Sequence, residues 1–143
     1  MGKVLYTAEA HVTGGRAEGH GRTSDGTLEI DLRLPPEMGG EGGGTNPEQL
    51  FAVGYAACFE GALGAVARRT KAEIGDAGID SKVSLVTGEG RTFTIAVELH
   101  VTLPSVADEQ AAELVREAHE VCPYSNATRG NIDVVLTANG NPV

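Results

Sequence analysis

The chain contains 143 residues, has a net charge of −9 at pH 7, and carries ordinary fractions of apolar and charged side chains. This length suits a single domain, residues 1–143, with one hydrophobic core. The acidic balance argues against nucleic acids and anionic membranes as partners, because phosphate groups attract Lys and Arg. The first residues lack the long apolar segment of a secretory signal, so we expect a cytoplasmic protein.

The first third of the chain predicts three strands. Apolar and polar side chains alternate over residues 3–12 and again over residues 28–34, which is typical of strands. The Gly-Gly pair at 14–15 predicts a hairpin between the first strand and a second that ends near residue 24. The glycine-rich residues 37–45 predict a flexible connector rather than a phosphate cradle, because they lack a Gly-Lys-Ser/Thr sequence.

A long helix is predicted from Asn46 to about residue 71. Asn46 is a good N-cap, Pro47 fits the first turn, and Gln49 stands where a capping box has an amide. The stretch 50–67 carries one charged residue and is rich in Ala and Gly, so its length and composition are marginal for a membrane span. We expect a helix buried on most sides, and because one copy of a small domain is too thin to cover it, we expect a dimer.

The rest of the chain predicts two strands, a second helix and a final strand. The strands lie near 81–89 and 91–103, and the last lies over 132–137. The helix between them has an apolar stripe that ends at Cys122, and Pro123 disfavours helix at that thiol. The order is βββαββαβ, which predicts an α+β fold with two long helices packed against antiparallel sheets.

Cys58 and Cys122 are the two cysteines of the chain. Cys58 lies within an apolar helix, where a free cysteine is often a small core residue. A reactive thiolate at mid-helix needs a nearby cation, and no Lys or Arg lies within nine residues of Cys58. The cation must therefore come from elsewhere in the fold, and Arg16, Arg91 and Arg129 are the candidates. An apolar pocket beside the sulfur is expected from three aromatic residues of the same helix, Phe51, Tyr55 and Phe59.

Cys122 stands in a different electrostatic setting. The C-terminus of a helix carries partial negative charge, which disfavours a thiolate there. Cys122 is therefore a poor first nucleophile and an acceptable resolving partner, although it could equally be a core residue. The pair His119 and Cys122 supplies only two metal ligands, so we predict no metal site. A redox cycle of two thiols needs no further group, so we also predict no bound cofactor.

Two segments around these cysteines resemble the cysteine motifs of the organic hydroperoxide resistance proteins, within the Ohr/OsmC family. They are Thr45-Asn-Pro-Glu-Gln-Leu-Phe-Ala-Val-Gly-Tyr-Ala-Ala-Cys58-Phe and Val121-Cys-Pro-Tyr-Ser-Asn-Ala-Thr-Arg-Gly-Asn131. The similarity extends nearly from end to end and includes Thr13-Gly-Gly-Arg16. Tyr55 is typical of the Ohr branch, whereas the OsmC branch tends to carry His at that position.

The resemblance implies a thiol peroxidase of the oxidative stress response that reduces alkyl or fatty acid hydroperoxides to alcohols. Cys58 would be the peroxidatic cysteine and Cys122 the resolving one, linked through a Cys58 sulfenic acid to a Cys58–Cys122 disulfide. Arg16 would activate the thiol, and Glu48 would orient Arg16. The resemblance also implies an intertwined homodimer and an external dithiol reductant, such as a dihydrolipoyl group or a lipoylated protein.

Glu48 and Cys58 are ten residues apart, which is about 15 Å along an unbroken helix. We therefore predict that the two residues of one site come from different subunits, or that the helix is broken between them. Without the resemblance, Glu48 would be interpreted as a first-turn acid favoured by the helix dipole. Two other functions remain open: a redox sensor that uses the same cysteines, and a non-catalytic protein that binds a small molecule.

Overall fold

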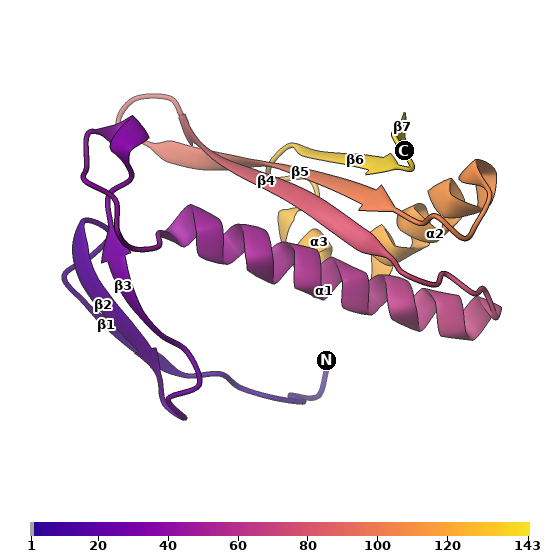
Figure 1. The fold of residues 1–143 in the computed structure, drawn as a ribbon, viewed down its shortest axis with the longest axis horizontal. Coiled ribbons are helices and arrows are strands. Elements are labelled where there is room, and N and C mark those ends of the chain that lie inside the picture. The colour runs from indigo at the N-terminus through magenta and orange to yellow at the C-terminus, as the bar shows by residue number, and fades with distance from the viewer. Residues whose placement is uncertain (1) are drawn as a thin grey trace. The chain divides into compact units, whose positions relative to one another are not determined.

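The computed structural model describes residues 2–143 and has an α+β architecture (Figure 1). The chain divides into two compact units, the first ending at Leu50 and the second covering Phe51–Val143. The elements of the first unit are β1 (Ala10–Thr13), β2 (Glu18–Thr23), β3 (Glu29–Arg33) and a 3-10 turn, η1 (Pro36–Met38). The elements that follow are α1 (Pro47–Thr70), β4 (Gly78–Thr87), β5 (Phe93–Thr102), α2 (Asp108–Val121), α3 (Pro123–Thr128), β6 (Val134–Ala138) and β7 (Asn141–Pro142).

The first unit forms an antiparallel sheet in the order β1-β2-β3, as the alternation predicted. The first strand is shorter than expected, because residues 3–9 are not a strand. Backbone N–H and C=O groups form a strand only where a neighbouring strand accepts and donates hydrogen bonds. Within residues 2–143, β1 pairs only over Ala10–Thr13 with β2. The apolar side chains of Val4, Leu5 and Tyr6 are left exposed.

The second sheet has the strand order β4-β5-β6-β7. The β4–β5 and β6–β7 pairs are antiparallel. In contrast to the predicted antiparallel sheet, β6 runs parallel to β5. Parallel neighbours need a crossover connection, and α2 and α3 form it between Thr102 and Val134. Proline at position 123 ends α2 but begins α3, a short helix that the periodicity did not predict.

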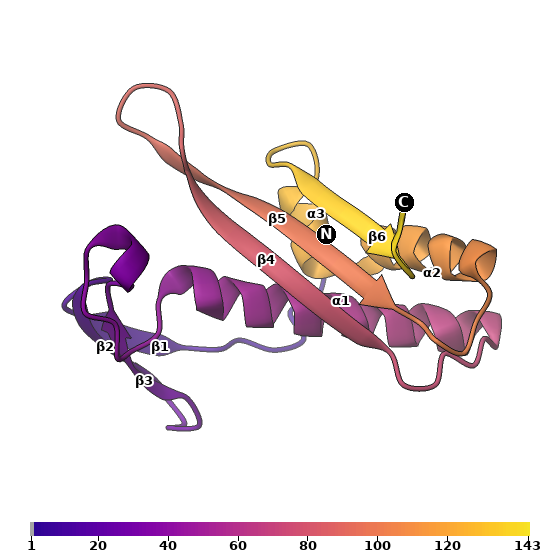
Figure 2. The same cartoon turned by 45° about the horizontal axis from the view of Figure 1, so that its top comes forward.

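The hydrophobic core lies between the second sheet and its helices. Figures 1 and 2 show that the part of α1 belonging to the second unit lies, together with α2, on one face of that sheet. Buried side chains of α1 recur at helical spacing and pack with apolar side chains of β5 and α2. The fully buried members with the largest volumes are Tyr55, Phe59, Leu63, Val66, Val97, Leu99, Val101, Leu103 and Val115.

Helix α1 begins where the capping pattern predicted. The side-chain oxygen of Asn46 accepts a hydrogen bond from the backbone N–H of Gln49 at 2.8 Å. The reciprocal half of the predicted capping box is not formed, since the Gln49 side chain accepts the Thr45 hydroxyl at 2.7 Å instead. This local cap fixes the start of the helix that carries Glu48 and Cys58.

By length and composition, α1 could cross a membrane, but the core helix of a folded domain can have the same properties. Within one copy of the chain, 33% of its most apolar stretch is buried. Val53, for example, is 72% exposed. One chain thus leaves much of the helix uncovered, as the sequence led us to expect, and the second copy that would cover it stays a prediction.

Candidate active site

The two cysteine sulfurs lie side by side in the second unit. The Sγ atom of Cys122 is 3.5 Å from the Sγ atom of Cys58, and both thiols are free. A disulfide has an S–S distance of about 2.05 Å, so roughly 1.5 Å of sulfur movement would close the bond. Side-chain rotation and small backbone shifts cover such a distance. The structure therefore brings together the two residues that the sequence assigned to one redox pair.

Cys122 is held in place by the junction of two helices. The apolar stripe of α2 ends in this residue, which is fully buried. Its backbone has φ −62° and ψ 124°, an extended conformation imposed by the ring of Pro123. Pro123 in turn fits the first position of α3, where its missing N–H is not needed. The local sequence Cys-Pro thus stops one helix, starts the next, and leaves the thiol facing the core.

Burial raises the pKa of the Cys58 thiol above its ordinary value. The backbone N–H of Tyr124 lowers that pKa, and the neighbouring Cys122 raises it. Within residues 2–143, none of the groups that shift it is a cation. The surroundings of Cys58 inside its own unit therefore favour the neutral thiol, and the activating cation stays a prediction.

Arg16 and Glu48 form a paired guanidinium and carboxylate in the first unit. Arg16 Nη1 donates to Glu48 Oε2 at 3.0 Å, and Nη2 donates to Oε1 at 3.0 Å. This fork-to-fork geometry fixes the orientation of the guanidinium as well as its distance. The hydrogen bonds to Glu48 raise the pKa of Arg16, and those from Arg16 lower the pKa of Glu48. Both side chains are thus charged at neutral pH.

The turn that carries Arg16 depends on glycine. Gly14 has φ +79°, and a Cβ atom there would overlap the carbonyl oxygen of Glu18. Only glycine fits a left-handed backbone at such a close approach. The turn joins β1 to β2 and directs Arg16 toward Glu48 in the first turn of α1.

The four predicted residues occur as two pairs, Arg16 with Glu48 in the first unit and Cys58 with Cys122 in the second. Helix α1 is continuous from Pro47 to Thr70, so the alternative of a helix broken between Glu48 and Cys58 is wrong. The other alternative, a site shared by two subunits, stays a prediction.

The other candidate arginines have different surroundings. Arg91 lies exposed in the turn between β4 and β5. Arg129 donates to the backbone carbonyl of His119 and, at 2.9 Å, to the side-chain oxygen of Asn126. Burial, followed by the charge of Arg129, lowers the pKa of His119. Among residues 2–143, no group of three or more His, Cys, Asp or Glu side chains is arranged to hold a metal ion.

Three buried hydroxyl groups beside the cysteines were not predicted from the sequence. The Tyr55 hydroxyl lies 2.8 Å from Ser125 Oγ and 3.1 Å from Thr128 Oγ1. The Tyr55 ring also contacts Phe51 and Tyr124, with centroids 5.9 and 5.7 Å away. Of the three aromatic residues expected around a pocket, Phe51 and Tyr55 pack with Tyr124 from α3, whereas Phe59 is buried in the core. The corresponding signal in the sequence is the pair Ser125 and Thr128, which follow Cys122-Pro123 and are one helical turn apart.

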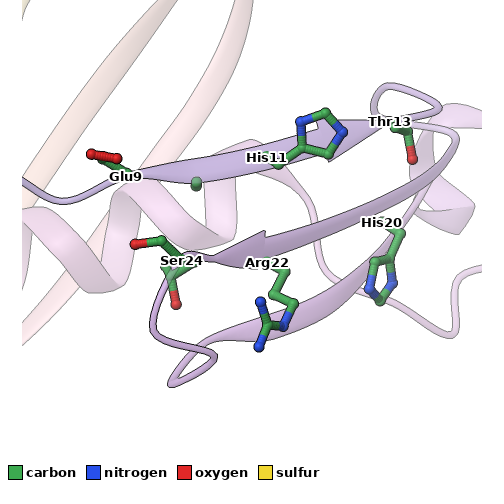
Figure 3. Close-up of a pocket in the computed structure, with 8 residues that line it drawn as sticks. Glu9, His11, Thr13, His20, Arg22 and Ser24 are labelled. Atoms are coloured by element: carbon green, nitrogen blue, oxygen red, sulfur yellow. The ribbon is translucent and has the colours of Figure 1, made fainter.

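A hollow of about 460 Å³ lies on the first unit, along β1 and β2 (Figure 3). His20 stands at its margin and contacts Asp31 and Glu29, each at 2.9 Å. The hydrogen bond with Asp31, followed by that with Glu29, raises the pKa of His20. None of the four predicted site residues lines this hollow, so we assign it no part in the chemistry.

Comparison with known proteins identifies close relatives. The model of the OsmC-like protein family matches residues 40–137. An organic hydroperoxide resistance protein of Xanthomonas axonopodis pv. citri is 56% identical over 137 residues, which cover 94% of this chain and 95% of that protein. The crystal structure of an organic hydroperoxide resistance protein from Legionella pneumophila has a TM-score of 0.89 at 52% identity, covering 95% of this chain and 98% of that one. The structure of OhrB from Bacillus subtilis has a TM-score of 0.86 at 49% identity, covering 94% and 99%.

Proposed function

Because the chain belongs to the organic hydroperoxide resistance proteins of the OsmC-like family, we propose that it is a cysteine-based peroxidase that reduces organic hydroperoxides to alcohols. The observation that carries the proposal is the 3.5 Å separation of the Cys58 and Cys122 sulfurs. Two free thiols at this distance can store and release two electrons without a bound cofactor. We propose a cytoplasmic location, since that compartment keeps unengaged thiols reduced.

In the first step, the Cys58 thiolate attacks the terminal oxygen of the hydroperoxide. The O–O bond breaks, the alkoxide takes up a proton and leaves as the alcohol, and Cys58 becomes a sulfenic acid. Cys58 is the partly exposed thiol and Cys122 the fully buried one, which supports Cys58 as the sulfur that meets the peroxide. The aromatic rings of Phe51 and Tyr124, which are at least partly exposed, favour an alkyl substituent over hydrogen peroxide.

In the second step, the sulfur of Cys122 attacks the sulfur of the Cys58 sulfenic acid. The S–S bond forms, the S–O bond breaks, and the oxygen leaves as water. An external dithiol then reduces the disulfide by two thiol exchanges, in which Cys58 is the more accessible sulfur for the first attack. A dihydrolipoyl group, free or on a protein, has the required pair of thiols.

The proposal includes a second copy of the chain. Burial raises the pKa of Cys58 within its own unit, so the thiolate requires a cation, and we assign this role to Arg16, oriented by Glu48. The continuous helix α1 supports an arrangement in which Arg16 and Glu48 of one protomer serve Cys58 of its partner. The exposed apolar flank of α1 and the exposed residues 4–6 also favour an intertwined dimer, because each would gain cover from a partner.

Steady-state turnover tests the function directly. With dihydrolipoamide as reductant, tert-butyl hydroperoxide is expected to be consumed catalytically, with kcat/KM at least ~10-fold above that for hydrogen peroxide because of the apolar contacts. Thioredoxin in place of dihydrolipoamide identifies the preferred class of dithiol. A redox sensor would form the Cys58–Cys122 disulfide once without sustained turnover. A small-molecule carrier would form no disulfide after one equivalent of hydroperoxide, and either result would contradict the proposal.

Replacement of Arg16 by Ala is expected to slow the reaction of Cys58 with hydroperoxide by about 100-fold, the usual effect of removing one preorganised charged donor. The pKa of Cys58 should also rise, because the thiolate loses its cation. The measurement is the pH dependence of the single-turnover rate, which rises with pH as the thiolate forms. The midpoint of this rise should move to higher pH in the variant.

The matched control is Arg22→Ala, which removes an exposed arginine that pairs with Glu29 on the same sheet. Its rate and midpoint should equal those of the wild type. If Arg16→Ala also retains both, the activating role belongs to another arginine.

A further inference from the structure

We propose that the buried hydroxyl groups of Tyr55, Ser125 and Thr128 form a clamp that positions Cys122 against Cys58 for disulfide formation. The role of this hydroxyl clamp in peroxide turnover rests on the proposed function. The effect of the clamp on the equilibrium between the dithiol and the disulfide does not depend on the proposed function.

The clamp joins the two segments that carry the cysteines. Tyr55 precedes Cys58 by three residues on α1, so both side chains lie on neighbouring positions of one helix face. Ser125 and Thr128 lie on α3, which begins directly after Cys122. The Tyr55 hydroxyl bonds to Ser125 Oγ at 2.8 Å and to Thr128 Oγ1 at 3.1 Å. Each bond therefore links the helix of one thiol to the helix that adjoins the other.

The hydrogen bonds of the clamp form one consistent set. Thr128 donates its hydroxyl hydrogen to the backbone carbonyl of Ser125 at 3.3 Å. Since Thr128 has a single hydroxyl hydrogen, Tyr55 donates to Thr128 Oγ1, and Ser125 donates to the Tyr55 oxygen. All three hydroxyl donors are then used. Tyr55 and Ser125 are fully buried, and Thr128 is 7% exposed, so water cannot easily replace a lost partner.

Helix α3 needs these hydrogen bonds to α1 because it is short. It has six residues, and an isolated helix of that length does not form stably in water. Its N-terminal boundary is Cys122 itself. The position of the Cys122 sulfur thus depends on how firmly α3 is fixed to α1. The Tyr55 hydroxyl and ring supply that contact, since the ring also packs on Tyr124.

A positioning role has a specific consequence during oxidation. The Cys58 sulfenic acid has two fates. Cys122 can attack its sulfur, which gives the disulfide and water, or the sulfenic sulfur can itself attack a second hydroperoxide, whose O–O bond breaks to give the sulfinic acid and an alcohol. The clamp acts on the first fate alone, because it holds the resolving sulfur near its target. It does not take part in the initial reaction of the Cys58 thiolate with peroxide.

The test is Tyr55→Phe in the full-length reduced protein, treated with increasing tert-butyl hydroperoxide without reductant. Intact mass measures the ratio of disulfide to sulfinic acid. We expect overoxidation at about fivefold lower peroxide, the effect of one net hydrogen bond on the population of the aligned state. The rate of the first oxidation should stay at the wild-type value. Ser84→Ala, which removes an exposed hydroxyl from β4, is the control and should change neither quantity.

A second measurement separates this proposal from the proposed function. In dithiothreitol redox buffers, the disulfide of Tyr55→Phe should be about fivefold less favoured than that of the wild type, a potential about 20 mV higher. This equilibrium needs no peroxide. If the wild type fails to react with hydroperoxide but the potential shifts as expected, the clamp stands and the proposed function does not.

A double variant distinguishes positioning from a loss of stability. Tyr55→Phe leaves Ser125 with an unsatisfied buried hydroxyl, and Tyr55→Phe/Ser125→Ala removes it, so the melting temperature should recover toward the wild type. The ratio of sulfinic acid to disulfide should stay raised, because the link between α1 and α3 is still absent. Recovery of that ratio together with stability, or an unchanged ratio and potential in Tyr55→Phe, would overturn the proposal.

Discussion

Replacement of Cys58 by Ser is expected to abolish the reduction of organic hydroperoxides, lowering kcat by at least ~10³-fold, as for the loss of other catalytic nucleophiles. A serine hydroxyl stays protonated and cannot accept the peroxide oxygen in a reversible form. The measurement is consumption of tert-butyl hydroperoxide with dihydrolipoamide as reductant. Circular dichroism of the variant should match the wild type, since the substitution changes one side-chain atom and Cys58 is only partly buried.

Substantial activity in Cys58→Ser would place the first reaction on Cys122 or outside the cysteine pair. The first possibility conflicts with the burial of Cys122, which is fully shielded from solvent within one chain. The double variant Cys58→Ser/Cys122→Ser distinguishes the two outcomes, because it retains activity only in the second.

Replacement of Cys122 by Ser is expected to separate the two steps of the cycle. The variant should consume the first equivalent of hydroperoxide within about threefold of the wild-type rate, because the attack on the peroxide needs only Cys58. Without a resolving sulfur, the Cys58 sulfenic acid should accumulate and then pass to the sulfinic acid. Trapping by dimedone and intact mass measure the two species in the absence of reductant.

The same experiment on the wild type provides the reference, in which the product is the Cys58–Cys122 disulfide and dimedone labelling stays low. A Cys122→Ser variant that resists overoxidation as well as the wild type would remove Cys122 from the resolving role, despite the 3.5 Å contact between the sulfurs.

Local signals in the sequence predicted local structure well. The Asn46 cap marks the start of α1, and the Cys122-Pro123 pair marks the end of α2. Both depend on interactions within a few residues, which is the range that periodicity and capping describe. The resemblance, rather than the residues alone, joined Arg16 to Glu48, and the structure pairs these side chains across 32 positions of sequence.

Structural features that depend on distant residues were not predicted from the sequence. The parallel pairing of β6 with β5 depends on a crossover of about 30 residues, and no local pattern specifies its direction. Residues 3–9 have the alternation of a strand but lack a pairing partner within the described chain. The Tyr55 hydroxyl meets Ser125 across 70 positions. A tyrosine in an apolar run gives no indication of where its hydroxyl will bond.

The parallel arrangement of β5 and β6 also restricts which sulfur Cys122 can reach. The segment that contains this residue is anchored at both ends in adjacent strands of one sheet. Cys122 therefore lies in a segment that is tethered at both ends and has no free end. A large excursion would require the ladder between the two strands to open. If Cys122 is the resolving thiol, as proposed, we expect it to react with the Cys58 of its own polypeptide, because this topology disfavours disulfide exchange between neighbouring molecules.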